Sequence, residues 1–438
     1  MIIILVILSA LVASIRYPGV GLALAASLYT LEHAFYLPGW LQGLMAIAPA
    51  LVAAVQFRRS SVRFHRIDAL MLAFIAYRLI SNAWAPTQID KTSIELLMNN
   101  ALLLAYYTSG RIIASSRDGR HFALEMLVGF LLIPLAYVLS PNLQQLWDRQ
   151  IFVGATAVGL SYPLNIWIVV GLAVVLFAWK ARNMRGPDAN TLPGQVAWTL
   201  GPVAIVWGTL LLLDNGSRGA LLGAAVALAA ALWIGGSRRL QRQILLAGVP
   251  LAVALVFIHL FEAAIVEWVG TLGRDRFSRL VIVALETLGL DTGYSIEDYA
   301  FRAREVVQAL AVSQFVNSPL IGCGYTCTTP STLMYPHNIF LEVAAELGLV
   351  GLSMFATLVL AAVYRAAATI SEYKNLTMFS VALVLLALLV QHQVSYFMDI
   401  ARMLFFALGA LVVKEGGIGA RESERTSLSF SAGHTLDR

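Results

Sequence analysis

The sequence predicts an all-α, polytopic integral membrane protein with about 12 transmembrane helices and one large, mainly helical segment outside the bilayer. Hydrophobic residues make up 59% of the 438 residues, and charged residues only 13%. The mean hydropathy of +0.76 lies far above that of soluble domains. Apolar runs of the length needed to span a bilayer recur along the chain. A chain of this composition is not expected to bind nucleic acid through its arginines, despite a net charge of +5.

The apolar runs place the predicted spans in chain order. Residues 2–15 and 19–35 flank Arg16-Tyr17-Pro18-Gly19, and are predicted as two short helices or one broken helix. The first run lacks a basic leading region, so it is interpreted as a retained span and not as a cleaved signal. The further predicted spans are 40–57, 67–84, 94–113, 122–139, 160–179, 196–213, 220–234, 244–269, 348–367, 377–391 and 401–413.

Basic residues predict the orientation of these spans. Clusters of arginine and lysine occupy alternate loops, at 58–66, 117–120, 180–185 and 238–242. Loops rich in such residues face the cytoplasm. The opposite side, which in a bacterium is the periplasm, then receives the long polar connection. The predicted location is therefore the bacterial inner membrane.

The predicted organisation has four parts. They are N-terminal transmembrane helices (1–269), a periplasmic segment (270–337), C-terminal transmembrane helices (338–413) and a disordered cytoplasmic tail (414–438). Within the periplasmic segment, apolar residues at helical spacing predict a helix over 298–316, stopped by Asn317-Ser318-Pro319.

A polar stripe follows the periplasmic segment, where the chain returns to apolar sequence. Pro336 suits the start of a helix, so a helix is predicted to begin beside His337. Asn338, Glu342 and Glu346 then share one face. The opposite face carries small and apolar residues, which are Leu341, Ala344, Gly348 and Gly351. Because lipid does not solvate carboxylates, this stripe requires a protein or water partner.

His337 is the candidate general base. A lone histidine at a membrane interface is more often structural than catalytic. The positive end of a helix dipole, however, favours the neutral imidazole that a base requires. Asn338, Glu342 and Glu346 are interpreted as the support of that helix.

Arginines on the predicted outer side are candidates for anion binding. Arg218 lies in the turn 214–219, which is also explained as an ordinary hairpin turn. Its position breaks the inward bias of positive charge, which favours an anion contact. The outer segment adds five more arginines, which form either a phosphate clamp or a solvated surface, and are Arg274, Arg276, Arg279, Arg302 and Arg304. Charges in or near apolar spans are secondary candidates for substrate contact, and are Glu32, Arg78, Asp399 and Arg402.

The two cysteines, Cys323 and Cys327, lie four residues apart on the predicted outer side, where a disulfide can form. A local bridge and two free thiols both remain open. No cysteine or histidine spacing is typical of a zinc site, so neither a metal nor another cofactor is expected.

Residues 337–342 and 345–352 together resemble the hallmark motif of the O-antigen ligase and polymerase superfamily. Two further elements support the resemblance. Gly216-Ser217-Arg218-Gly219 is similar to the family's Ser-Arg-Gly turn, and residues 318–324 are similar to its Pro-hydrophobic-Gly-x-Gly element. Arg302, ahead of Ala309-Leu310, matches an arginine that precedes that element in the family. The resemblance covers roughly residues 214–352.

This resemblance implies a membrane-embedded, largely α-helical glycosyltransferase with its site on the periplasmic face. The implied ligase transfers O-antigen glycan from undecaprenyl pyrophosphate to lipid A–core oligosaccharide, with inversion and without a metal. His337 is then the general base, and Arg218 and Arg302 bind the pyrophosphate. Additional anion contacts would come from Arg304, Arg276 and Arg274. The partners are the lipid-linked donor, the lipid A–core acceptor and membrane lipids, with no nucleic acid.

Three alternatives stay open. An O-antigen polymerase or a protein O-oligosaccharyltransferase shares these motifs, although the short C-terminal tail favours a ligase over protein glycosylation. A lipid or glycan transporter is also polytopic, but internal repeats typical of such folds are not evident in the sequence.

Overall fold

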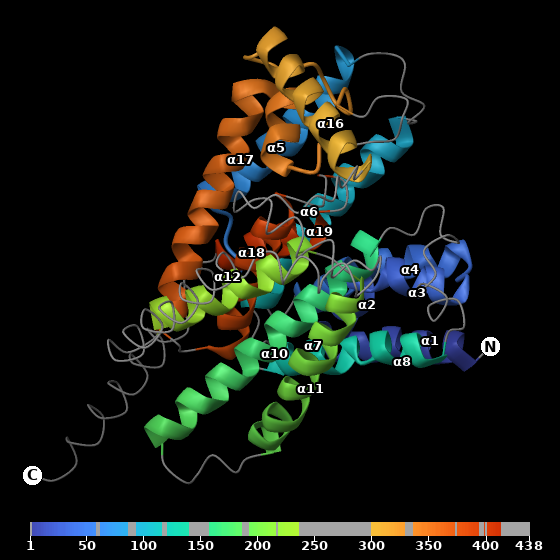
Figure 1. Cartoon of the computed structure of the whole chain (residues 1–438), viewed down its shortest axis with the longest axis vertical. Helices are drawn as coiled ribbons and strands as arrows, with labels where there is room; N and C mark the ends of the chain where they lie inside the picture. Colours follow the sequence, from blue (N-terminus) through green and yellow to red (C-terminus); the bar gives the residue numbers. More distant parts are fainter. Residues whose placement is uncertain are drawn as a thin grey trace, which may run out of the picture.

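A computed structural model of the chain describes residues 2–57, 62–85, 93–115, 121–139, 157–185, 192–215, 218–235, 299–328, 336–372, 375–393, 398 and 401–412. Within these ranges the secondary structure is helical, without a strand, which confirms the all-α class (Figure 1). Among the described residues, three helices are long and apolar enough to cross a membrane, and they are Gly39–Phe57, Ser161–Lys180 and Ile339–Glu372. Shorter apolar helices accompany them. The number of about 12 spans stays a prediction.

The helices follow the predicted spans closely. In chain order they are α1 (Ile2–Ser14), α2 (Pro18–Ala26), α3 (Leu28–Phe35), α4 (Gly39–Phe57), α5 (Arg66–Ile80), η1 (Ser81–Ala83), α6 (Ser93–Ser115), α7 (Phe122–Phe130), α8 (Leu132–Leu139), α10 (Ala157–Arg185), α11 (Leu192–Asn215), α12 (Arg218–Gly235), α16 (Tyr299–Asn317), α17 (Ile339–Glu372), α18 (Leu376–Gln391) and α19 (Arg402–Leu411). The break predicted near Pro18 separates α1 from α2, and α16 ends at Asn317 as expected. The predicted span 244–269 lies outside the described residues.

The predicted span 122–139 is divided into α7 and α8 at Leu131. Pro134 explains the division, because its ring nitrogen has no hydrogen to donate to the carbonyl four residues earlier.

Glycines let several helices pack at close range. Gly171 of α10 lies against Gly201 and Ala204 of α11, and Gly208 lies against Ile168. These pairings run in opposite directions along the two helices, so α10 and α11 are antiparallel. In membrane proteins, a large apolar side chain gains little by packing between helices, because lipid is equally apolar. Small residues are favoured at such contacts because they let the two backbones approach closely.

The contact of α6 with α19 gives a first testable prediction. A methyl group at Gly409 would overlap the Tyr107 carbonyl. Gly409→Val should therefore destabilise the protein by about 1–3 kcal/mol or more, seen as a lower unfolding temperature in detergent. Gly39→Ala is the control, because nothing lies within 4 Å of a Cβ at that position. Equal unfolding temperatures for the two variants would contradict this packing.

The described helix α17 is not straight. Gly348 has φ 62° and ψ −163°, which interrupts the helix. The rings of Phe340 and Phe355 lie 5.3 Å apart, whereas a straight helix would separate these residues by about 22 Å. The chain therefore reverses at Gly348 into a short arm (residues 339–347) and a long arm (349–372), which lie side by side near α16 (Figure 1). The predicted single face through Gly348 and Gly351 was therefore wrong.

Aromatic rings hold this hairpin to the bundle. Phe355 is fully buried, and its ring lies 5.7 Å from Phe74 of α5 and 6.3 Å from Phe405 of α19. With Phe340, four rings from three helices form one cluster. The position of the short arm is therefore set by the apolar core beneath it.

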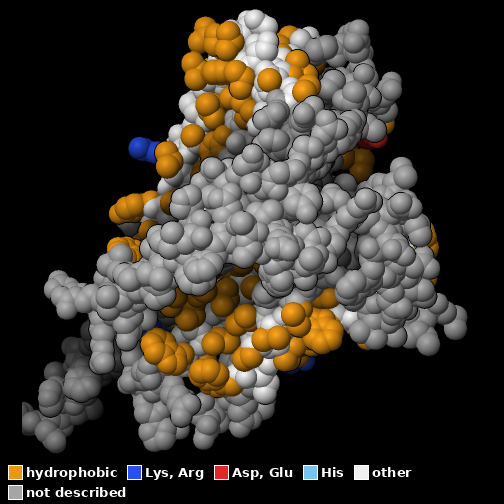
Figure 2. Space-filling model, in the orientation of Figure 1, with side chains coloured by type: hydrophobic (Ala, Val, Ile, Leu, Met, Phe, Trp, Pro, Cys, Tyr) orange, Lys and Arg blue, Asp and Glu red, His pale blue; other side chains and the backbone are white. Residues whose placement is uncertain are grey.

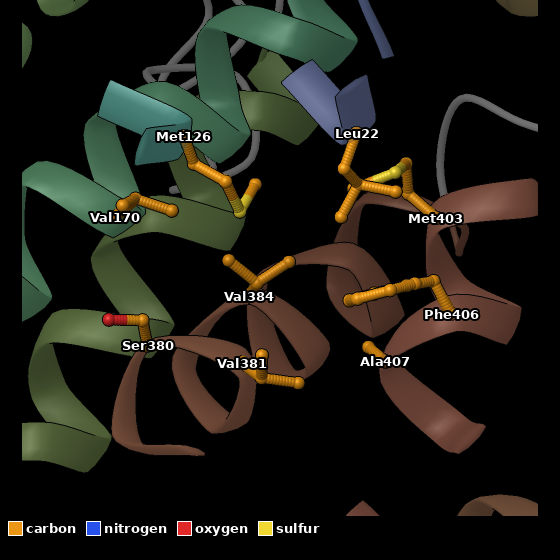
Figure 3. Close-up of a pocket in the computed structure, with 9 residues that line it drawn as sticks. All are labelled: Leu22, Met126, Val170, Ser380, Val381, Val384, Met403, Phe406 and Ala407. Carbon is orange, nitrogen blue, oxygen red and sulfur yellow. The ribbon is translucent and has the colours of Figure 1, made fainter. Parts of the chain in front are cut away.

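A small cavity in this core is a packing void. Its volume is about 10 Å³, close to the minimum for one water. Eight of its nine lining residues are apolar, and Figure 3 shows Ser380 at the edge of the group. The Ser380 hydroxyl already donates to the Leu376 carbonyl. A water here would lack the polar partners that retain it.

Large apolar side chains remain uncovered by protein. They include Val306 of α16, Leu320, and Leu349 of the long arm, with exposed fractions of 68%, 66% and 47%. Figure 2 shows hydrophobic side chains gathered over the upper end of the molecule, where α16 and α17 lie. Apolar surface of this extent is typical of a protein surrounded by lipid.

Candidate active site

The candidate site is built around His337, at the start of the short arm. His337 is half-buried and has φ 56°, in the left-handed region. Asn338 is the helix cap, since its Oδ1 accepts hydrogen bonds from the backbone N–H groups of Phe340 (3.1 Å) and Leu341 (3.0 Å). α17 begins at Ile339, as the sequence predicted to within a residue or two. His337 therefore stands outside the helix proper, next to its positive end.

Three elements fix the beginning of the short arm. The Ile339 N–H donates to the His392 carbonyl at the end of α18 (3.0 Å). The Glu342 carboxylate, only 5% exposed, accepts from the Met398 N–H at 3.0 and 3.2 Å. Gln308 of α16 donates its Nε2 hydrogen to the Pro336 carbonyl (3.2 Å). The backbone on both sides of His337 is therefore held.

Residues 318–328, here called the docking loop, fix the other end of the short arm. The N–H groups of Cys323 and Gly324 donate to the carbonyls of Ala345 (2.9 Å) and Glu346 (3.0 Å). These carbonyls lie in the last turn of the short arm, where helical partners are lacking. The Thr328 hydroxyl donates to the Glu346 carboxylate (2.9 Å), and both residues are buried. The docking loop thus caps the short arm.

Two glycines explain why the docking loop and the hairpin fit together. Gly322 has φ 75°, and a methyl group there would overlap the Glu346 carbonyl. Gly348 has φ 62°, and a methyl group there would overlap the Leu320 carbonyl. Each glycine therefore accommodates the backbone of the opposite segment. The Pro-hydrophobic-Gly-x-Gly element and Gly348 therefore belong to one interface.

A disulfide joins Cys323 to Cys327 within the docking loop. Their Cα atoms lie 5.9 Å apart, a usual separation for bridged cysteines. Gln314 of α16 donates to the Cys327 carbonyl (2.7 Å). Of the two alternatives left open by the sequence, the bridge is the one the structure contains.

A buried polar cluster lies beside the start of the short arm. Asn165 of α10 donates to Gln391 of α18 (2.6 Å), and Gln391 donates to Ser161 (3.4 Å). All three are fully buried. His392, which accepts from Ile339, follows Gln391 directly. The cluster therefore ties α10 to the end of α18 and, through His392, to the start of α17.

α12 begins at this same end of the bundle. Gly223, in its second turn, lies against the Ala387 carbonyl and the Asn165 side chain. The rings of Phe177 and Phe379 lie 6.4 Å apart at the other end of α10 and α18, so these two helices are antiparallel. α11 is antiparallel to α10 and is followed almost directly by α12. The backbone of Arg218 therefore lies at the end where α18 finishes and α17 starts.

The predicted site residues fall into three groups. His337, Asn338, Glu342 and Glu346 lie together at the short arm. Arg218 begins α12, and Arg302 and Arg304 lie in α16, but the side chains of these three are outside the described residues. Arg274 and Arg276 lie wholly outside them. Within the described ranges, no three His, Cys, Asp or Glu side chains gather as a metal site.

Several polar residues that hold the site were not predicted from the sequence. Thr328 lies in a polar loop, where nothing in its spacing distinguishes it. Asn165, Gln391 and His392 lie in or at the end of apolar runs, and are fully buried. Polar groups in an otherwise apolar span are costly, and this was the signal that could have identified them.

Comparison with known proteins agrees with the motifs. Residues 203–356 match a family model described as O-antigen ligase. The matched range includes Arg218, the docking loop and His337, and covers just over a third of the chain. No curated protein matches the chain significantly. The match confirms the resemblance stated from the sequence.

Proposed function

We propose that this chain, which belongs to the O-antigen ligase and polymerase superfamily through residues 203–356, is the ligase. It transfers O-antigen glycan from undecaprenyl pyrophosphate to lipid A–core oligosaccharide at the periplasmic face of the inner membrane. One observation carries this proposal. The starts of α12 and of the short arm, next to Arg218 and His337, lie at the same end of the bundle, where α18 finishes.

This arrangement suits a pyrophosphate leaving group. Two helix N-termini at one end of the bundle supply partial positive charge that favours an anion nearby. Arg218 and Arg302 would add full charges, and Arg304, Arg276 and Arg274 are further candidates. Negative charge builds on the pyrophosphate as the bond from the anomeric carbon to its oxygen breaks. Fixed cations are then the main source of stabilisation, and no proton needs to be given to the leaving group.

His337 is the base that this scheme requires. The acceptor hydroxyl attacks the anomeric carbon while its proton passes to His337, and attack opposite the pyrophosphate inverts that centre. The neighbouring carboxylates are less suitable. Glu342 and Glu346 are 5% and 2% exposed, and their oxygens accept from Met398 and Thr328. His337 is the more accessible group.

The identity of the acceptor is tested with purified protein and lipid-linked glycan. A ligase forms glycan-bearing lipid A–core only when lipid A–core is added. A polymerase lengthens the glycan on its own carrier when lipid A–core is absent. Transfer to neither acceptor would contradict both activities.

The arginine assignment gives a second prediction. Arg218→Ala and Arg302→Ala should each lower turnover by about 10²–10³-fold, the usual loss for one group that stabilises developing negative charge. Lysine at either position should recover part of the activity, because it restores charge but not the bidentate geometry. The exposed Arg16 serves as the control, and Arg16→Ala should behave like wild type. Wild-type turnover in both site variants would show that neither arginine stabilises the pyrophosphate.

Removal of divalent metal gives a third prediction. Because arginines and helix N-termini are proposed to stabilise the pyrophosphate, a chelator should leave turnover by the purified enzyme unchanged. Loss of turnover that is restored by added Mg²⁺ or Mn²⁺ would show that the metal-independent scheme is wrong.

A further inference from the structure

Arg78 of α5 is a buried cation outside the proposed catalytic groups. The residue is only 1% exposed. Its Nη1 donates to the Asn100 Oδ1 of α6 (3.1 Å), and its guanidinium carbon lies 4.7 Å from the centre of the Tyr325 ring. A buried charge is costly, and a desolvated guanidinium over an aromatic face is one of the stronger contacts that can offset this cost.

Tyr325 connects Arg78 to the docking loop. Its ring is 2% exposed, and it stands between the two groups of the loop that hold Glu346. On one side, the Gly324 N–H donates to the Glu346 carbonyl (3.0 Å). On the other, the Thr328 hydroxyl donates to the Glu346 carboxylate (2.9 Å). A shift of the Tyr325 ring would therefore disturb both contacts.

The rest of α5 and η1 makes weaker contacts with the same loop. The Tyr77 hydroxyl donates to the Ile321 carbonyl (3.3 Å), and this contact is exposed. Gly324 lies against the backbone of Ala85, just after η1. The Arg78–Tyr325 stack is therefore the buried contact that holds the docking loop against α5.

We infer that Arg78 is a positioning residue for His337, acting through Tyr325, the docking loop and the short arm. The inference rests on the proposed function of His337 as the base. Because Arg78 is buried beneath the loop, it acts without touching substrate. Its loss leaves the short arm free to shift, and a displacement of about 1 Å at a reacting group costs on the order of 10²-fold in rate.

The kinetic test compares variants of the two stacked residues. Arg78→Met should lower kcat on the order of 10²-fold while the KM values for donor and acceptor stay unchanged. Tyr325→Leu should cause the same loss. Tyr325→Phe keeps the ring face and should retain most of the activity, since phenylalanine also accepts a guanidinium. The combined Arg78→Met and Tyr325→Leu variant should be no worse than either alone.

A second test does not depend on activity. Amide hydrogen exchange of the purified, detergent-solubilised protein should become faster in residues 319–328 and 338–347 on Arg78→Met or Tyr325→Leu. Arg16→Met is the matched control, because Arg16 also lies over a tyrosine ring, that of Tyr17 at 5.7 Å, but on the surface. It should leave exchange in both segments unchanged.

The two tests separate the possible failures. If wild-type protein transfers no glycan, the proposed function fails, while the exchange experiment still decides whether Arg78 holds the short arm. If Arg78→Met is not recovered folded, Tyr325→Leu carries both tests, since it leaves the Asn100 contact in place. Wild-type kcat in these variants, or unchanged exchange at 338–347, overturns the inference. A raised KM for one substrate with unchanged kcat also overturns it, because Arg78 would then bind that substrate.

Discussion

His337→Ala is expected to leave the protein folded in the membrane and to abolish glycan-capped lipopolysaccharide. The imidazole is proposed to take the proton of the acceptor hydroxyl, a contribution typically of about 10²–10⁴-fold. The fold should tolerate the change, because Asn338, and not His337, caps the helix. Lipopolysaccharide from cells carrying only the variant is separated by size, and the variant protein is quantified in the membrane fraction.

A second substitution separates chemistry from backbone conformation. His337 has φ 56°, where alanine is less favourable than histidine. Asparagine adopts this conformation readily but cannot act as a base at neutral pH. His337→Asn should therefore be as inactive as His337→Ala while matching wild-type stability. A normal ladder of glycan-capped products from either variant would show that His337 is not the base.

Much of the fold follows from local sequence. The apolar runs predicted the helices of the described chain, and Pro336 predicted the start of α17 to within two residues. The reversal at Gly348 did not follow, because a single glycine inside an apolar run is compatible with a continuous helix. What makes it reverse is the docking loop, whose Leu320 carbonyl occupies the space of a side chain at 348.

The candidate site was predicted only where one segment supplies it. The stripe from Asn338 to Glu346 is local, so helical periodicity revealed it. The Asn165–Gln391 hydrogen bond joins residues 226 positions apart, and the Arg78–Tyr325 stack joins α5 to the docking loop. Pairings of this kind depend on which helices are neighbours. Periodicity and spacing along the sequence carry no information about which helices are neighbours.

Gly348→Ala is expected to cause the largest loss of stability among single-methyl changes near the site. At φ 62° and ψ −163°, glycine is the residue that fits, and the strain for alanine is about 1–3 kcal/mol. The added methyl group would also overlap the Leu320 carbonyl, so the docking loop would have to separate from the short arm. Thermal unfolding in detergent and glycan transfer should both be impaired. Gly43→Ala is the control, since a Cβ there meets nothing within 4 Å and alanine favours helix.

Substitution of Gly322 tests whether the loss of stability arises at the interface between the docking loop and the hairpin. Gly322→Ala should impair stability and transfer as Gly348→Ala does, because its methyl group would overlap the Glu346 carbonyl. If the docking loop and the hairpin form one contact, either substitution already opens it, and the second adds little. The double variant should then be destabilised by clearly less than the sum of the single changes, with a coupling of about 0.5–3 kcal/mol. Additive losses would mean that the two glycine motifs act separately, and the docking loop would then not be what holds the helix that follows His337.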